Sequence, residues 1–226
     1  MEYEIIGETM PLVTLILSRG EFVKSRAGAM KWMDNSIKME TGMDGGVGGF
    51  LKRKVMKESG MINTYTAEKD GSRIAFGHTF PGHIIALDVT NNSIICQKRA
   101  YLCSTKDVEL EIAFQQSLGS GFFGGEGFVM QKLLGRGQAF VEIDGEVVEM
   151  DLDENQIIKV ETGSVGMYEE SVEMNIEKVR GMKNMLFGGE GIFLTSLKGP
   201  GKVWLQTMPI QSMASEVSPY LNIKSK

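Results

Sequence analysis

Several residue types that build common active sites are scarce in this sequence. Its 226 residues include two cysteines, two histidines and five prolines. The cysteines, Cys96 and Cys103, lack the spacing of a metal motif, and we expect two free buried thiols in a reducing compartment. No window approaches 18 consecutive apolar residues, so the sequence predicts no transmembrane helix. The N-terminal residues MEYEIIGETM have neither the basic nor the apolar region of a signal peptide, which favours a cytoplasmic protein without membrane insertion.

An excess of positive charge is also absent. The formal net charge is −5 and the pI is near 5.3, which argues against a nucleic-acid partner because such partners require a basic surface. A local exception is the cluster of Lys52, Arg53, Lys54 and Lys57. This cluster is either a solvated face or a patch that contacts phosphate. Arg53 and Lys54 are therefore candidate ligand-binding residues.

Glycine, in contrast, is abundant, with 28 residues, and its positions repeat. The segment FGGEG at residues 123–127 returns at residues 187–191, and a fainter copy at residues 45–50 has valine in place of glutamate. Repetition at a fixed register predicts copies of one structural unit. We place three pseudo-repeats in a single domain, at residues 1–75, 76–143 and 144–226.

Each predicted repeat contains alternating apolar residues that lead into a tight turn. An apolar period of two is typical of a half-buried strand. Gly or Asn at the second turn position suits the positive φ of a two-residue hairpin loop. The three turns are Arg19-Gly20, Asn91-Asn92 and Glu154-Asn155. We therefore predict three hairpins with apolar cross-strand pairs, namely Leu17 with Phe22, Val89 with Ile94, and Leu152 with Ile157. The fold class is all-β, with short helices near residues 50–59 and 212–221.

Candidate chemical residues are few. Glu126 and Glu190 occupy equivalent repeat positions, where they either bind a ligand or cap the glycine turn through backbone N–H groups. Residues 119–124 fit the pattern GxGxxG, but a dinucleotide fingerprint must open a helix, and this segment leads into a strand. We expect turn-forming glycines there and no cofactor. His78 and His83 flank a Pro-Gly turn without further metal-type partners, so we expect a loop role, no metal and no catalytic residues.

Four segments carry a resemblance to a known family. They are residues 27–30 (AGAM), 80–82 (FPG), 187–191 (FGGEG) and 199–206 (GPGKVWLQ), and with them the chain resembles the altered inheritance of mitochondria 24 family. The resemblance implies a fold similar to that of the tryptophan RNA-binding attenuation protein. That fold is a short, β-sandwich-like double-stranded β-helix, present three times per chain. It also implies a homotrimer, in which three chains form a pseudo-ring of nine modules. The family supplies no established catalytic residues.

The function that these observations favour is a non-enzymatic oligomeric scaffold or interaction protein. Closure of its β modules into a ring would remove exposed strand edges, which otherwise promote aggregation. The alternative is a small-molecule or RNA-binding module that uses clefts between repeats, near the glycine clusters and the basic patch. Its partner would be an unidentified small ligand, RNA or another protein.

Overall fold

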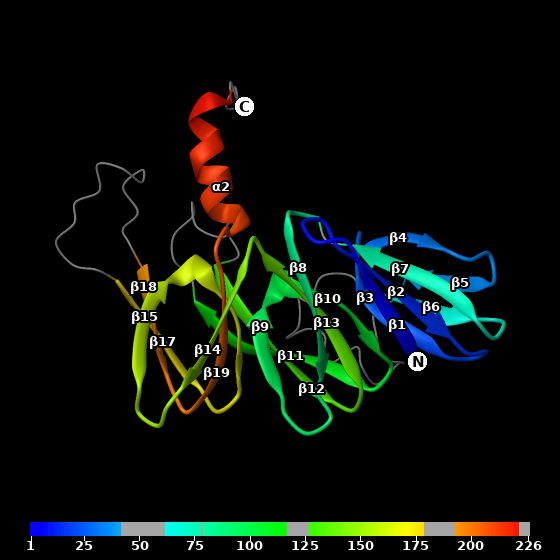
Figure 1. The fold of residues 1–226 in the computed structure, drawn as a ribbon, viewed down its shortest axis with the longest axis horizontal. Coiled ribbons are helices and arrows are strands. Elements are labelled where there is room, and N and C mark those ends of the chain that lie inside the picture. The colour runs from blue at the N-terminus through cyan, green and yellow to red at the C-terminus, as the bar shows by residue number, and fades with distance from the viewer. Residues whose placement is uncertain (42–61, 78, 117–126, 179–192, 222–226) are drawn as a thin grey trace.

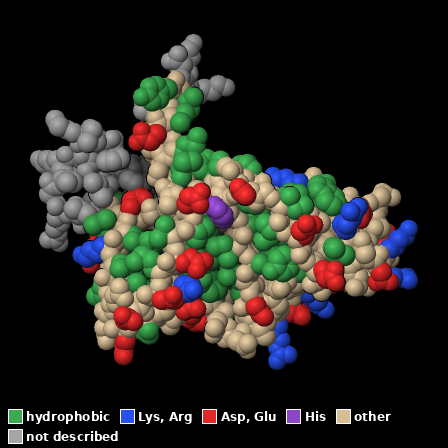
Figure 2. Space-filling model, in the orientation of Figure 1, with side chains coloured by type: hydrophobic (Ala, Val, Ile, Leu, Met, Phe, Trp, Pro, Cys, Tyr) green, Lys and Arg blue, Asp and Glu red, His purple; other side chains and the backbone are tan. Residues whose placement is uncertain are grey.

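A computed structural model of the chain describes residues 1–41, 62–77, 79–116, 127–178 and 193–221 (Figure 1). Within these ranges the chain is mostly β-strand, with one α-helix, α2 (Ile210–Val217), that projects from the body near the C-terminus (Figure 1, Figure 2). The predicted all-β class and the predicted C-terminal helix are both confirmed. The helix predicted near residues 50–59 lies outside the described residues.

The strands form four antiparallel sheets. The first has the order β1 (Glu2–Ile6), β2 (Leu12–Leu17), β7 (Ser72–Gly77), β4 (Met30–Met33). The second is β5 (Ile37–Thr41), β6 (Ile62–Ala67), β3 (Phe22–Arg26), β10 (Tyr101–Thr105), β13 (Gln138–Asp144), β8 (Gly82–Asp88). The third is β11 (Val108–Gln116), β12 (Phe128–Gly135), β9 (Ile94–Gln97), β16 (Val165–Glu169), β19 (Gly201–Gln206), β14 (Val147–Leu152). The fourth is β15 (Ile157–Glu161), β18 (Phe193–Lys198), β17 (Glu173–Lys178). Short 3-10 turns are η1 (Lys98–Ala100), η3 (Thr162–Ser164) and η4 (Ser218–Tyr220).

The same order of pairings occurs in three sets of six consecutive strands. We call them set 1 (β2 to β7), set 2 (β8 to β13) and set 3 (β14 to β19). In each set the sixth strand pairs with the first and third, and the fifth pairs with the second and fourth. Buried apolar clusters fill the three sets in turn, from one end of the molecule to the other (Figure 1). The boundaries of the three repeats stay a prediction.

The predicted hairpins are wrong, although the turns themselves are present. β2 pairs with β1 and β7, whereas β3 pairs with β6 and β10, so the turn between β2 and β3 joins two different sheets. The strands on either side of the other two turns likewise lie in different sheets. Gly20 (φ 80°) and Asn155 (φ 63°) have the positive φ expected of them. A tight turn with positive φ can therefore pass the chain from one packed sheet to the other. The cross-strand pairs predicted at these turns do not form, namely Leu17 with Phe22, Val89 with Ile94, and Leu152 with Ile157.

The two cysteines are free and fully buried, as predicted. Burial raises the pKa of Cys96 to about 12 and raises the pKa of Cys103 as well, so both stay protonated thiols. A buried thiol that stays protonated behaves as a small apolar side chain. Both cysteines therefore belong to the packing between sets, not to a reactive centre.

Candidate functional site

Pairs of strands join the three sets to one another. At the first joint, β3 of set 1 pairs with β10 of set 2, and Ser25 lies opposite Cys103. At the second joint, β9 of set 2 pairs with β16 of set 3, and Cys96 lies opposite Met167. These four side chains are fully buried. Each joint thus uses the second strand of one set and the third strand of the next.

Charged side chains are buried at the first joint. Lys24 Nζ on β3 donates a hydrogen bond to the carbonyl oxygen of Val108, at 2.7 Å. Arg26 Nη2 donates to both carboxylate oxygens of Glu142, at 2.8 and 2.7 Å. The Glu142 side chain is 5% exposed, and its burial outweighs the attraction of Arg26 and raises the pKa of the carboxyl to about 7. Burial also raises the pKa of Asp144, two residues further along β13.

The second joint carries uncharged side chains at the same positions. Gln97 ends β9 as Arg26 ends β3, and Gln206 ends β19 at the position that Glu142 has in β13. Both glutamine amides donate to the carbonyl oxygen of Gly163, at 3.0 Å from Gln97 and 2.7 Å from Gln206. Two amides therefore satisfy this joint, and the fold does not require an ion pair there.

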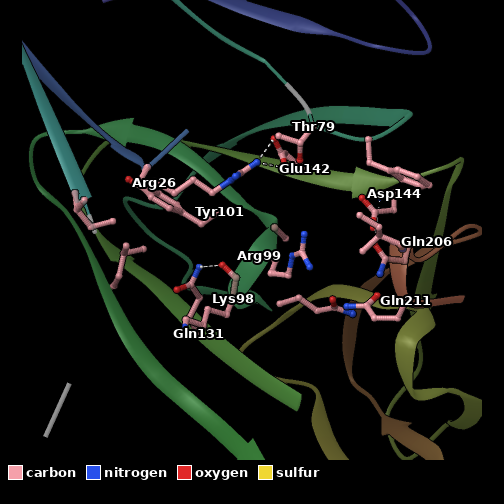
Figure 3. A pocket seen from close by; sticks show the side chains of 17 residues that line it. Arg26, Thr79, Lys98, Arg99, Tyr101, Gln131, Glu142, Asp144, Gln206 and Gln211 are labelled. Carbon is pink, nitrogen blue, oxygen red and sulfur yellow. Dashed lines mark hydrogen bonds and ion pairs between the residues drawn. The ribbon is translucent and has the colours of Figure 1, made fainter. Parts of the chain in front are cut away.

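A cavity of about 220 Å³ lies between the first joint and the glutamines Gln97 and Gln206 of the second, and we call it the joint pocket (Figure 3). Figure 3 shows Arg26 and Glu142 at one end, Gln211 of α2 at the other, and Arg99 of η1 between them. Two buried polar atoms of the lining, Arg26 Nε and Gln211 Oε1, have no hydrogen-bond partner in the described chain. An unsatisfied buried polar atom costs roughly 1–3 kcal/mol, so these two positions favour an external partner.

Two further edges correspond to the joints but have no partner strand among the described residues. β4 is the third strand of set 1 and β15 is the second strand of set 3, and each ends a sheet. Trp32 of β4 comes directly after a bulge and lies opposite the sixth strand of its set, which is the position of Cys103 in β10 and of Met167 in β16. Cys103 and Met167 are fully buried, whereas Trp32 is 38% exposed. Val160 of β15 lies opposite the fifth strand of its set, which is the position of Ser25 in β3 and of Cys96 in β9. Ser25 and Cys96 are fully buried at the joints, whereas Val160 is only half-buried. We call β4 and β15 the open edges.

The four ligand-binding candidates from the sequence, Arg53, Lys54, Glu126 and Glu190, lie outside the described residues, as does His78. His83 is described. Its Nδ1 lies 2.9 Å from the carbonyl oxygen of Gly145, and this contact holds β8 against the turn after β13. Among the described residues no group of three or more His, Cys, Asp or Glu side chains is arranged to hold a metal ion. No helix in the described ranges is both long and apolar enough to span a membrane.

The residues of the joint pocket were missed by the sequence analysis. Arg26 and Glu142 are 116 residues apart, and no local motif connects them. A signal was nevertheless present, because Arg26, Gln97 and Glu161 occupy one repeat position with three different charges. A comparison of side-chain charge between the predicted repeats would have shown that the charge at this position changes while the strand pattern around it does not.

One comparison with known proteins shows the family, and another shows the fold. The family model described as mitochondrial biogenesis AIM24 matches residues 3–208. The search of curated proteins found no match. A crystal structure of a Streptococcus pyogenes protein, solved by a structural genomics consortium, is similar in fold, with a TM-score of 0.79 and 20% sequence identity. The similarity covers 97% of this chain and 99% of the streptococcal chain. The chain therefore belongs to the mitochondrial biogenesis AIM24 family.

Proposed function

We propose that this protein is a non-enzymatic scaffold that assembles head to tail, by pairing β15 of one copy with β4 of the next. The observation that carries this proposal is that the same kind of joint occurs twice inside the chain. The strands for a third joint are divided between its two ends. We read the three strand sets as three copies of one unit, so the molecule ends in two complementary halves of a joint.

The open edges differ from the remaining sheet edges. Those edges are the fourth strands β5, β11 and β17, the first strands β8 and β14, and the added strand β1 beside β2. Within the part of the chain that the structure describes, first and fourth strands pair with no other set. Second and third strands pair with another set wherever a neighbouring set exists. An unpaired strand edge is a template for another chain. The open edges β4 and β15 are the edge strands whose counterparts in the neighbouring sets pair across a joint.

The register of the proposed joint follows from the two internal joints. Trp32 of the next copy would lie opposite Val160, in the manner of Cys103 with Ser25 and Met167 with Cys96. This pairing would cover Trp32, and it would shield Val160. Apolar cross-strand pairs contribute roughly 0.2–1 kcal/mol each beyond alanine.

Polar groups at the open edges are also complementary. Lys159 has the position of Lys24, so its Nζ would donate to the carbonyl of Ile37 in the next copy, as Lys24 does to Val108. Glu161 has the position of Arg26. In the next copy, Gly77 has the position that Glu142 has at the first joint. A Cβ on Gly77 would lie only 2.7 Å from Cε of Lys31, so the Lys31 side chain fills the space beside Gly77. Glu161 and Lys31 would therefore form an ion pair with the signs of Arg26 and Glu142 reversed.

A closed assembly would leave neither open edge exposed. Three chains, with nine strand sets, is the number that the family resemblance suggests, and we propose a homotrimer. We also propose a cytoplasmic location, where the thiols Cys96 and Cys103 remain reduced as they are in this fold.

Charge reversal at the proposed joint tests the assembly. Lys31→Glu and Glu161→Lys should each lower the trimer fraction in sedimentation equilibrium, because each places two like charges together. The double variant should restore the trimer, since the ion pair is re-formed with exchanged signs. Arg136→Glu is the control, because Arg136 lies in the exposed turn between β12 and β13 of the middle set, away from both open edges. Equal behaviour of the three single variants, or no rescue in the double variant, would contradict the proposed register.

A second candidate function is supported by the joint pocket. Its unpartnered polar atoms, Arg26 Nε and Gln211 Oε1, favour small-molecule binding in a cleft between repeats. RNA binding has no comparable observation in its favour, because the basic patch that suggested it lies outside the described residues. An interaction with another protein stays an expectation from the sequence.

A further inference from the structure

The first joint carries charges that the fold does not need. At the second joint, Gln97 and Gln206 close the same positions with neutral amides. Arg26 and Glu142 at the first joint form a buried ion pair, which loses hydration that its Coulomb attraction regains only in part. Charged side chains that line a cavity, at positions where uncharged amides can satisfy the same joint, are typical of a binding site.

Positive charge predominates in the joint pocket. The cations in its lining are Arg26, Lys98 and Arg99, and the carboxylates are Glu142 and Asp144. Glu142 is already paired with Arg26. Burial raises the pKa of Glu142 to about 7, which weakens its negative charge near neutral pH, and it also raises the pKa of Asp144. The exposed guanidinium of Arg99 has no ion-pair partner in the part of the chain that the structure describes, and Figure 3 shows it between the two ends of the pocket.

The hydrogen-bonding groups of the pocket specify both an acceptor and a donor. Arg26 contacts Glu142 through Nη2 alone, and its Nε–H is left to donate to an acceptor. Gln211 Oε1, on the opposite wall, is left to accept from a donor. Between these ends the lining includes the apolar side chains Phe80 and Leu110. At about 220 Å³ the pocket is smaller than the roughly 300–1,000 Å³ of sites for drug-sized ligands, so its ligand is small.

We propose that the joint pocket binds a small organic carboxylate that carries a hydrogen-bond donor at its far end. The carboxylate accepts from Arg26 Nε and Arg99, the apolar body packs against Phe80 and Leu110, and the donor reaches Gln211 Oε1. Hydrogen bonds between a guanidinium and a carboxylate are charge-assisted and about twice as strong as neutral ones. The inference rests on the second candidate function and not on assembly, because every group in the site belongs to one chain.

Isothermal titration calorimetry with three related compounds tests the site. The probe is 4-hydroxybenzoate, which has a carboxylate, an apolar ring and a donor. 4-Hydroxybenzamide keeps the ring and the donor without the charge, and benzoate keeps the charge without the donor. The expected order of affinity has 4-hydroxybenzoate first, with the amide at least about tenfold weaker, a difference of about 1.4 kcal/mol. Benzoate should be several-fold weaker because Gln211 stays unsatisfied.

Variants of two exposed arginines complete the test. Arg99→Gln should weaken 4-hydroxybenzoate at least about tenfold. Arg136→Gln, in the exposed turn between β12 and β13, should bind it like the unaltered protein. Equal binding by Arg99→Gln and Arg136→Gln, equal binding of acid and amide, or no binding of any probe up to about 10 mM would overturn the proposal. Sedimentation of the same samples distinguishes this result from a failure of assembly, because Arg99 lies away from the open edges.

Discussion

Trp32 offers the sharpest perturbation of the proposed assembly. The side chain is 38% exposed in the single chain, while its counterparts at the internal joints, Cys103 and Met167, are fully buried. Pairing of β4 with β15 of another copy would bury the remaining surface. Trp32→Ser should therefore weaken the association of folded chains.

The size of the effect can be estimated from the exposed area. A large aromatic side chain presents roughly 250 Å², so 38% exposure leaves about 100 Å² to be covered. At about 25 cal/mol per Å² this burial stabilises the joint by about 2.5 kcal/mol, or roughly 60-fold in the association constant. The rest of the ring, roughly 150 Å², is already covered within the chain, and by the same conversion it is worth about 4 kcal/mol of folding stability. The variant also loses the contact of Arg73 with the ring, at 5.6 Å, worth about 0.5–1 kcal/mol at an exposed site. The variant therefore weakens folding as well as association, so circular dichroism must first show that it is folded under the conditions of the assay.

Sedimentation equilibrium over a range of concentrations measures the effect on association. Trp32→Ser should shift the midpoint of dissociation to a concentration at least tenfold higher. Tyr220→Ser is the matched control, because Tyr220 is an aromatic residue with 87% exposure that lies on η4, far from the open edges. An unchanged midpoint in Trp32→Ser, or an equal shift in both variants, would refute the assignment of Trp32 to a joint.

Two further predictions concern the folded chain itself. The pKa of Glu142, about 7 when folded against an ordinary 4.5, means that the folded chain binds this proton more tightly than the unfolded chain does. Stability should therefore fall as pH rises from about 4.5 to 7, by up to about 1.4 kcal/mol per pH unit. Urea unfolding of Glu142→Gln should lose this part of the slope, and an equal slope in both proteins would contradict the buried carboxyl. Gly82→Ala should lower the melting temperature strongly, because its Cβ would collide with the backbone oxygen of Ile143. Gly20→Ala, with open space and φ 80°, should cost only about 1–2 kcal/mol, and similar losses in both would show that the close approach at Gly82 is incorrect.

Local features of the fold could be predicted from the sequence because they depend on local chemistry. Alternating apolar residues predicted strands, Gly20 and Asn155 predicted positive φ, and a short helix was predicted at residues 212–221, where α2 and η4 lie. The partner of each strand could not be predicted in the same way. A tight turn such as Arg19-Gly20 reverses the chain equally well within a sheet or between two sheets. Contacts between strands distant in sequence decide between the two, and no local pattern reports them.

The candidate site was less predictable than the fold, for a related reason. Sequence reasoning sought ligands in the glycine-rich segments, at Glu126, Glu190, Arg53 and Lys54, because repetition draws attention to what the copies share. The joint pocket depends on what the copies do not share. Arg26 and Glu142 are an ion pair where Gln97 and Gln206 are neutral, and only the pairing of β3 with β10 brings the charged residues together.

Native mass spectrometry of the purified protein tests the central claim most directly. Pairing of β15 with β4 in a closed assembly predicts a trimer of the 24.9 kDa chain, without a continuous series of larger species. Trp32→Ser should convert this trimer largely to monomer at the same concentration. A protein that remains a monomer at micromolar concentration, or that forms an open-ended series of oligomers, would contradict the closed head-to-tail scaffold.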